Sequence, residues 1–386
     1  MSTITRIVVQ SFAYELEDFG ANPMVFEKGA SKRFAKFAVT VESDDGLAGS
    51  YIPHLGGTGH ALAQVKEMAP GLIGRDAEQR EKIFEDLKIG WRHFDKIGIA
   101  ALDAALWDLA GKKYDASVAR LLGGYRERLP AYASTYPGQV TCGGLDSVEA
   151  YADFAEDCVA RGFPGFKIHG FMDGKPATEI AIMTAIRDRV GNTIKLMTDP
   201  ASSLPSFLDA VEVGRACDDL GLFWYEDPYR DASSSAAAHK RLRGFVRTPL
   251  MIAEHIRGFE QKADFVLAGG TDILHVDPEL DGGITGTLKL ARFADALGME
   301  VQLHTAGPIH RHCMAAIPNT HFYELGLLRP DAWNGFQPPV YADEYGDQLD
   351  NVGEDGCVPV PTGPGLGVTY DWGKIARWET AREVFE

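Results

Sequence analysis

Short apolar runs alternate with helical stretches at nearly even spacing from Pro130 onward. Apolar runs bounded by turn residues are typical of buried strands, and apolar residues at helical spacing indicate the helices between them. The expected strands are Leu129–Ala133, Gly165–His169, Ile194–Asp199, Leu222–Glu226, Leu250–Glu254, Ile273–Asp277, Glu300–His304 and His321–Glu324. The clearest helices between them are Ser147–Arg161, Ile180–Val190, Ser206–Leu220 and Gly286–Leu297.

Eight β/α alternations over about 200 residues predict an α/β fold of the (β/α)8 (TIM-like) barrel type. A doubly wound parallel sheet is the rival architecture. That fold usually carries a glycine-rich fingerprint after a strand, and none of the expected strands is followed by one. The pattern therefore favours the barrel, which we expect to span residues 129–337.

The residues on either side of the barrel follow a different pattern. Strand-like runs occur at Thr5–Tyr14, Phe34–Val41 and Leu47–Ile52. A helical stretch from Ala61 to Leu122 follows them, so residues 1–128 are predicted to form an α+β capping domain. Residues 338–386 lose the alternation and are rich in Gly, Pro and Asp, and we expect this C-terminal segment to return to the capping domain.

The composition restricts the partners and the compartment of the protein. The net charge is −17, which argues against a nucleic acid partner, because such proteins need a basic face. No apolar run approaches the roughly 20 residues of a membrane helix, and the N-terminus is too polar for a signal peptide. Five scattered cysteines without a C-x-x-C pair suggest a reducing compartment. We expect a cytoplasmic homo-oligomer without a membrane partner.

Each expected strand from the second to the eighth ends in ionisable residues. In chain order these are Lys167 with His169, then Asp199, Glu226, Glu254, Asp277, His304 and Glu324. The carboxyl ends of barrel strands meet at one rim, where barrel enzymes keep their active sites. One such carboxylate alone is commonly a helix cap or a surface group, but three on adjacent strands repel one another unless a cation neutralises them. Hard oxygen ligands favour Mg²⁺, so we predict Asp199, Glu226 and Glu254 as its ligands.

Two further groups suggest proton transfer beside this cation. Lys167 and His169 flank Ile168 on one strand, so their side chains share a face. His304 lies one β/α unit after Asp277, whose carboxylate is expected to hydrogen-bond the imidazole and fix its tautomer. Bases on opposite sides of a metal-bound carboxylate indicate proton abstraction next to that carboxylate.

The order Lys-x-basic, Asp, Glu, Glu, Asp, His, Glu on successive strands resembles the mandelate racemase subgroup of the enolase superfamily. The resemblance covers nearly the whole chain, with the N-terminal region and the C-terminal tail similar to the capping domain of that family. It implies that Asp199, Glu226 and Glu254 hold Mg²⁺ and that Asp277 with His304 forms a His–Asp dyad.

The resemblance also implies roles for the remaining strand-end residues. Glu324 is expected to hydrogen-bond a carboxylate oxygen of the substrate, and Lys167 with His169 occupies the base motif of the second barrel strand. Family members usually carry Lys-x-Lys at this motif, whereas this chain has Lys167-Ile168-His169. A histidine at the second position still accepts a proton, with a lower intrinsic pKa than lysine.

The implied chemistry is Mg²⁺-dependent abstraction of the α-proton of a carboxylate substrate through an enediolate. Dehydration of a sugar acid to a 2-keto-3-deoxy acid is the first interpretation, because members of the subgroup with a His–Asp dyad resemble sugar-acid dehydratases. Racemisation or epimerisation of a 2-hydroxy acid and lactone cycloisomerisation are the alternatives. A ligand-binding barrel with a decayed site is the non-enzyme alternative, against which the complete set of strand-end residues argues.

Substrate specificity is expected to come from loops of the capping domain that close over the barrel. The candidate loops are Phe19–Phe26 and Tyr51–His60, and the glycine run of the second loop suggests mobility. Within it, Tyr51 and His54 are predicted to contact the substrate, a small carboxylate of the sugar-acid type, together with Lys167 and Glu324.

Overall fold

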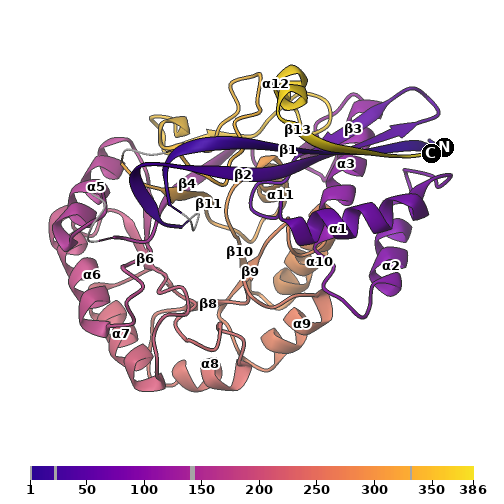
Figure 1. The fold of residues 1–386 in the computed structure, drawn as a ribbon. Coiled ribbons are helices and arrows are strands. Elements are labelled where there is room, and N and C mark those ends of the chain that lie inside the picture. Colours follow the sequence, from indigo (N-terminus) through magenta and orange to yellow (C-terminus); the bar gives the residue numbers. More distant parts are fainter. Residues whose placement is uncertain (1, 21–23, 140–143, 331–332) are drawn as a thin grey trace.

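A curled sheet of parallel strands forms the centre of the protein in the computed structural model, which describes residues 2–20, 24–139, 144–330 and 333–386 (Figure 1). Its strands are β4 (Arg128–Thr135), β5 (Gly165–Ile168), β6 (Lys195–Thr198), β7 (Tyr225–Glu226), β8 (Leu250–Ile252), β9 (Ile273–Val276), β10 (Glu300–Leu303) and β11 (Tyr323–Leu328). They are ordered β10-β9-β8-β7-β6-β5-β4-β11. The ends of this order are bridged by the amide of Val301, which donates to the carbonyl of Asn319 at 2.8 Å.

Helices form the outer layer of this ring in Figure 1. They are α5 (Val148–Ala160), α6 (Pro176–Val190), α7 (Phe207–Leu220), α8 (Ala236–Leu242), α9 (Phe259–Leu267), α10 (Gly283–Ala296) and α11 (Pro308–Ala316). In the described part of the chain, β11 is followed by the short 3-10 helix η2 (Leu349–Asn351) and by β12 (Cys357–Pro359), which pairs antiparallel with β4. The predicted barrel is confirmed, and every predicted barrel strand overlaps an observed one.

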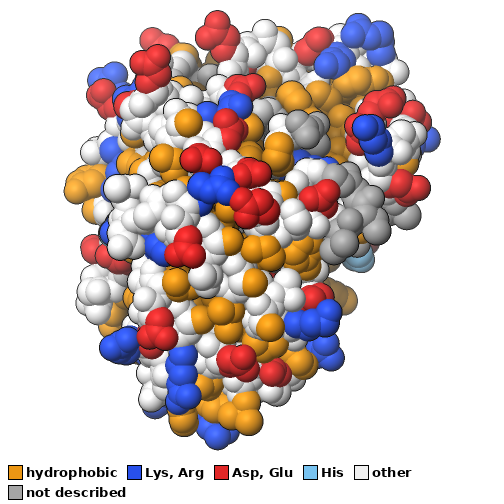
Figure 2. Space-filling model, turned by 90° about the vertical axis from the view of Figure 1, so that its left-hand side faces the viewer, with side chains coloured by type: hydrophobic (Ala, Val, Ile, Leu, Met, Phe, Trp, Pro, Cys, Tyr) orange, Lys and Arg blue, Asp and Glu red, His pale blue; other side chains and the backbone are white. Residues whose placement is uncertain are grey.

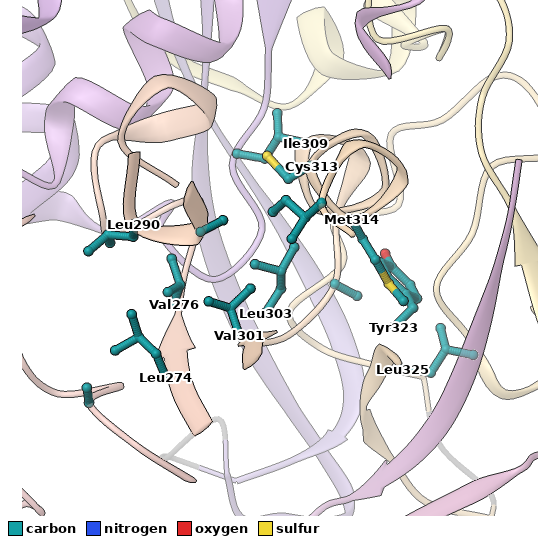
Figure 3. Close-up of a cluster of buried hydrophobic side chains, with 14 of the residues drawn as sticks. Leu274, Val276, Leu290, Val301, Leu303, Ile309, Cys313, Met314, Tyr323 and Leu325 are labelled. Carbon is teal, nitrogen blue, oxygen red and sulfur yellow. The ribbon is translucent and has the colours of Figure 1, made fainter. Parts of the chain in front are cut away.

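Alternation along the strands separates an outer apolar layer from the barrel interior. Figure 3 shows Leu274 and Val276 of β9 and Val301 and Leu303 of β10 in one cluster with side chains of α11. Successive side chains of a strand point to opposite faces, so the residues between these face the interior. Part of the barrel interior is filled by a second apolar cluster, which we call the barrel floor and which is made of Tyr132, Met197, Trp224, Met251 and Ile273. The barrel is therefore a packed core rather than a pore.

The capping domain is an antiparallel sheet that runs beside the barrel ring in Figure 1. Its strands are β1 (Ile4–Phe19), β2 (Phe26–Ser43), β3 (Ala48–Tyr51) and β13 (Glu379–Phe385), ordered β13-β1-β2-β3. Its helical elements are α1 (Gly59–Met68), η1 (Ala69–Leu72), α2 (Arg80–Gly90), α3 (Gly98–Lys113) and α4 (Val118–Leu121), and α12 (Trp372–Arg377) lies near the C-terminus. Because β13 pairs with β1, the C-terminal segment completes the N-terminal sheet.

Helix α3 connects the capping domain to the barrel. Asp103 accepts hydrogen bonds from the backbone amide of Thr285 at 3.0 Å and from its hydroxyl at 2.6 Å, at the start of α10. Five residues further along the helix, Asp108 accepts from the amide of Ser50 in β3 at 2.7 Å and from the amide of Leu366 at 2.8 Å. The two carboxylates of α3 thus join the cap sheet, the barrel and the C-terminal segment.

The outer helices carry charges of both signs. Figure 2 shows acidic, basic and apolar side chains interspersed on the face that lies on the left of Figure 1, where α5 and α6 are found. On these helices Arg189 pairs with Glu149, Asp153 and Glu156. On this surface one arginine thus pairs with three carboxylates, in keeping with the acidic excess of the whole chain. Among the described helices, none is long and apolar enough to span a membrane.

Replacing Asp108 by Ala is expected to lower the free energy of unfolding by about 2–4 kcal/mol, because two buried amides lose their acceptor. Urea unfolding followed by circular dichroism measures the change. Glu67→Ala, which removes an exposed carboxylate on α1, is the matched control and is expected to change stability by less than about 0.5 kcal/mol. Equal effects of the two substitutions would contradict the connecting role of Asp108.

Candidate active site

A buried ammonium group lies at the centre of the strand-end residues. Lys167 is 1% exposed and donates from Nζ to both carboxylate oxygens of Glu226, each at 2.9 Å. The same Nζ lies 3.0 Å from Oε1 of Glu324 and 3.7 Å from Oδ2 of Asp199. Burial alone would lower the pKa of Lys167, but the carboxylates, Glu226 first, outweigh it and raise the pKa well above its usual value. Lys167 is therefore charged at neutral pH.

His169 extends this cluster from the same strand. Its Nδ1 lies 2.7 Å from the carbonyl oxygen of Thr135, which can only accept, so Nδ1 carries a hydrogen. Its Nε2 lies 2.9 Å from Oδ2 of Asp199. The backbone contact sets the orientation of the His169 ring and turns Nε2 toward the carboxylates.

The opposite side of the cluster is formed by a second imidazole. Nδ1 of His304 lies 2.8 Å from Oδ2 of Asp277, and Nε2 lies 3.2 Å from Oε1 of Glu254. Burial would lower the pKa of His304, but Glu254 and Asp277 raise it to about 9. Glu324 joins the two sides, because its Oε2 accepts from the amide of Thr305 at 2.6 Å while its Oε1 contacts Lys167.

The position of Glu254 depends on a backbone irregularity. Met251 belongs to the barrel floor, so strict alternation would turn Ala253 inward and Glu254 outward. Instead Ile252 and Ala253 both belong to the apolar layer that packs outside the strands. Ala253 has φ 104°, a backbone region that residues with a side chain rarely occupy. This break in the alternation brings Glu254 to the interior beside His304. Strained backbone of this kind is common at functional sites.

The predicted metal ligands do not all fall into one group. Glu226 and Glu254 offer ligand atoms within 4.8 Å of each other together with His275, and a second group on the rim consists of Asp227, Glu254 and His255. Asp199 instead contacts His169 and Lys167. Both ring nitrogens of His275 are buried, and neither has a hydrogen-bond partner in the part of the chain that the structure describes. Both groups contain hard carboxylate oxygens, so the donor set fits a divalent cation.

Several residues of this site were not among the predicted set, including Asp227 and His255 of the rim group. His275 and Glu279 were not predicted either, and they lie on the β9 segment, two residues before and two residues after Asp277. Strand alternation was the available signal for His275, since it places positions 275 and 277 on one face. Glu279 follows the strand end, and its partners lie in the capping domain, so no local pattern identifies it.

The capping domain meets the barrel at Glu279. Its Oε1 accepts from the Tyr51 hydroxyl and, at 2.7 Å, from the amide of His54, while Oε2 accepts from the amide of Gly56 at 2.6 Å. His54 is buried, and its Nε2 lies 2.6 Å from the hydroxyl of Tyr341. Burial, above all, lowers the pKa of His54 to about 3, so this imidazole is neutral.

The residues predicted to contact substrate, Tyr51 and His54, thus lie in the contact between cap and barrel, and substrate binding by them stays a prediction. A Cβ at Gly56 would lie 2.8 Å from the Cβ of Glu279, so glycine is required there for close approach. Of the other predicted loop, Phe19–Phe26, residues 21–23 lie outside the described residues.

The barrel, its cap and this set of strand-end side chains define the protein class. Residues 17–123 match the mandelate racemase / muconate lactonizing enzyme N-terminal domain, and residues 150–374 match the enolase C-terminal domain-like family. The chain belongs to the mandelate racemase / muconate lactonizing enzyme family of the enolase superfamily.

Particular relatives carry several activities. The chain is 28% identical over 364 residues to 3,6-anhydro-alpha-L-galactonate cycloisomerase of Streptomyces coelicolor, covering 90% of this chain and 92% of that protein. The structure of D-glucarate dehydratase from Agrobacterium tumefaciens complexed with magnesium is 29% identical, with a TM-score of 0.85 over 98% of this chain and 99% of that one. L-talarate dehydratase from Polaromonas sp. JS666, complexed with Mg and L-glucarate, is 25% identical, with a TM-score of 0.80 over 100% and 99% of the two chains.

Glu226→Gln is expected to lower the affinity for Mg²⁺ at least about tenfold, because a neutral amide replaces a carboxylate of the cluster. The increase of the melting temperature with Mg²⁺ concentration measures the affinity, and the far-UV spectrum checks that the fold is kept. Glu260→Gln, at an exposed carboxylate of α9, is the control and should respond to Mg²⁺ as the wild type does. Wild-type affinity in Glu226→Gln would exclude this carboxylate as a ligand.

Proposed function

We propose that the protein is a Mg²⁺-dependent sugar-acid dehydratase, which removes the α-proton of a carboxylate substrate and expels the β-hydroxyl as water to give a 2-keto-3-deoxy acid. The observation that carries the proposal is the pair of proton-transfer groups on two sides of the carboxylate cluster. Lys167 and His169 belong to the β5 segment, whereas His304 follows β10. The two structures of sugar-acid dehydratases that resemble this chain along nearly its full length support the reaction class.

Asp199, Glu226 and Glu254 are proposed to hold the cation. When bound, Mg²⁺ supplies positive charge that stabilises the negative charge developing on the substrate carboxylate as the α-proton leaves. Asp199 and Glu226 both contact Lys167, and the Asp199 carboxylate would have to turn from His169 toward Glu226 to join the cation site. Lys167 is proposed to donate to one oxygen of the substrate carboxylate and Glu324, which must first take up a proton, to the other, so that Cα lies between the two imidazoles.

The proton transfers follow from the fixed tautomers. Nε2 of His169 faces the cluster because Nδ1 is committed to the carbonyl of Thr135, so within the Lys167/His169 pair the imidazole is assigned the role of base, beside the charged ammonium of Lys167. Nε2 of His304 faces the cluster because Nδ1 is committed to Asp277, and its proton is assigned to the departing hydroxyl, which leaves as water. The α-proton thus goes to one side of the substrate and the leaving group takes a proton from the other.

Cycloisomerisation of a lactone or epimerisation of a 2-hydroxy acid is the second candidate. Groups on opposite faces of one carbon are also what inversion at that carbon needs, and the relative from Streptomyces coelicolor is a cycloisomerase. The products separate the candidates, because only dehydration forms a 2-keto acid. A decayed site without activity is disfavoured by the retention of every strand-end residue. A cytoplasmic, homo-oligomeric enzyme with no nucleic acid or membrane partner completes the proposal.

The test has two stages. A library of sugar acids is first incubated with the Mg²⁺-loaded protein, and the formation of a 2-keto acid identifies the substrate. His304→Asn and His169→Asn are then incubated with that substrate in D₂O, and proton NMR follows the α-proton. His304→Asn is expected to exchange the α-proton for deuterium without forming product, whereas His169→Asn is expected to do neither, because it lacks the proposed base.

His321→Asn is the matched control, since this histidine is 42% exposed and pairs with Glu300 at the opposite end of the strands. It should form product as the wild type does. Exchange in His169→Asn but not in His304→Asn would reverse the two roles. Inversion of a 2-hydroxy acid without any 2-keto acid would replace dehydration by epimerisation.

A further inference from the structure

His275 is a buried imidazole that the proposed reaction does not use. It lies on β9, where Leu274 and Val276 on either side of it pack outward in the cluster of Figure 3. His275 therefore faces the barrel interior, one layer above Ile273 of the barrel floor. Its side chain is fully buried, and neither ring nitrogen has a hydrogen-bond partner among the described residues. An unpartnered buried polar group is costly, so this imidazole needs a ligand or a function.

The distances from His275 to the neighbouring carboxylates suit a shared cation better than a hydrogen bond. Its Nδ1 lies 3.4 Å from Oε1 of Glu226 and 3.8 Å from Oε2 of Glu254. Both distances exceed the roughly 2.7–3.2 Å of an N–H···O hydrogen bond. Two ligand atoms bound to one cation can lie at most two metal–ligand bonds apart, which is about 4.0–4.4 Å for bonds of about 2.0–2.2 Å. Both distances at His275 are within this limit. Two carboxylates and an imidazole at this spacing leave room for one cation among them.

The ring nitrogens of His275 are available for metal binding. An imidazole binds a metal ion through the lone pair of one ring nitrogen. Neither ring nitrogen of His275 takes part in a hydrogen bond with the described residues, so the nitrogen next to Glu226 can serve as the donor atom.

We propose that His275 supplies a nitrogen ligand to the cation held by Glu226 and Glu254, which gives this centre a mixed nitrogen and oxygen ligand set. This inference rests on the proposed cation site and adds a donor to it. Imidazole nitrogen favours first-row transition ions over Mg²⁺, whose preferred ligands are oxygens. The carboxylates still bind Mg²⁺, whereas the nitrogen contributes selectively to the binding of Mn²⁺ and Co²⁺.

The experiment loads the full-length protein with Mn²⁺ alone and records pulsed electron paramagnetic resonance spectra, in which a directly bound ¹⁴N gives a hyperfine coupling. The wild type should show this coupling, and His275→Gln should lose it. His255→Gln is the matched control, because His255 belongs to the rim group that also contains Glu254 but is 37% exposed. Its spectrum should keep the coupling.

Calorimetric titrations give a second readout. His275→Leu is expected to weaken Mn²⁺ and Co²⁺ binding at least about tenfold and Mg²⁺ binding less. Equal weakening of all three ions would mean that His275 only positions the carboxylates and would overturn the inference. A wild-type Mn²⁺ spectrum without ¹⁴N coupling would also overturn the inference, and so would a coupling that persists in His275→Gln. Neither result depends on whether His275→Leu folds. If the wild type bound none of the three ions, the proposed cation site itself would be overturned.

Discussion

The buried ammonium of Lys167 is the interaction on which the rest of the site depends. Three carboxylates of the rim, on Asp199, Glu226 and Glu324, lie within 3.7 Å of its Nζ. Buried carboxylates cannot stay ionised without compensating charge, and removal of one partner from such a group is strongly destabilising. Lys167 supplies part of that charge. The imidazole of His169 contacts Asp199 and that of His304 contacts Glu254. The proposed cation would supply the remaining positive charge.

The β9–α10 segment couples this charge cluster to the capping domain. Acidic residues alternate along it, and each has its own partner: Asp277 binds His304, Glu279 binds the cap loop at Tyr51, and Asp281 binds Lys262. They are also linked through the backbone, since the amide of Glu279 donates to Asp277 at 2.7 Å. A displacement of the cap loop would therefore act on the segment that orients His304. The amide of Glu279 thus links the cap loop at Tyr51 to the carboxylate that orients His304.

Much of the fold was predictable because the barrel repeats a local pattern. Strand alternation and helical periodicity are properties of neighbouring residues, so the predicted strands overlap the observed ones even where β7 is reduced to Tyr225–Glu226. The order of strand-end residues was likewise readable, because parallel strands bring their carboxyl ends to one rim. The orientation of Glu254 was not readable, since it requires a positive φ at Ala253, a residue type that does not signal one. Nor was the role of Gly56, whose close neighbour Glu279 is more than two hundred residues away.

The sequence by itself thus determined the architecture, the family and the rim residues, because these follow from periodicity and from the chemical identity of side chains at strand ends. Only the tertiary structure decided which of those side chains meet. It grouped Glu226 and Glu254 with His275, turned Asp199 toward His169, and placed Tyr51 and His54 in the contact between cap and barrel. The reason is that these contacts join residues from separate strands and domains, whose distances depend on barrel curvature, on local backbone strain and on the docking of the cap, and none of these is encoded in a short stretch of chain.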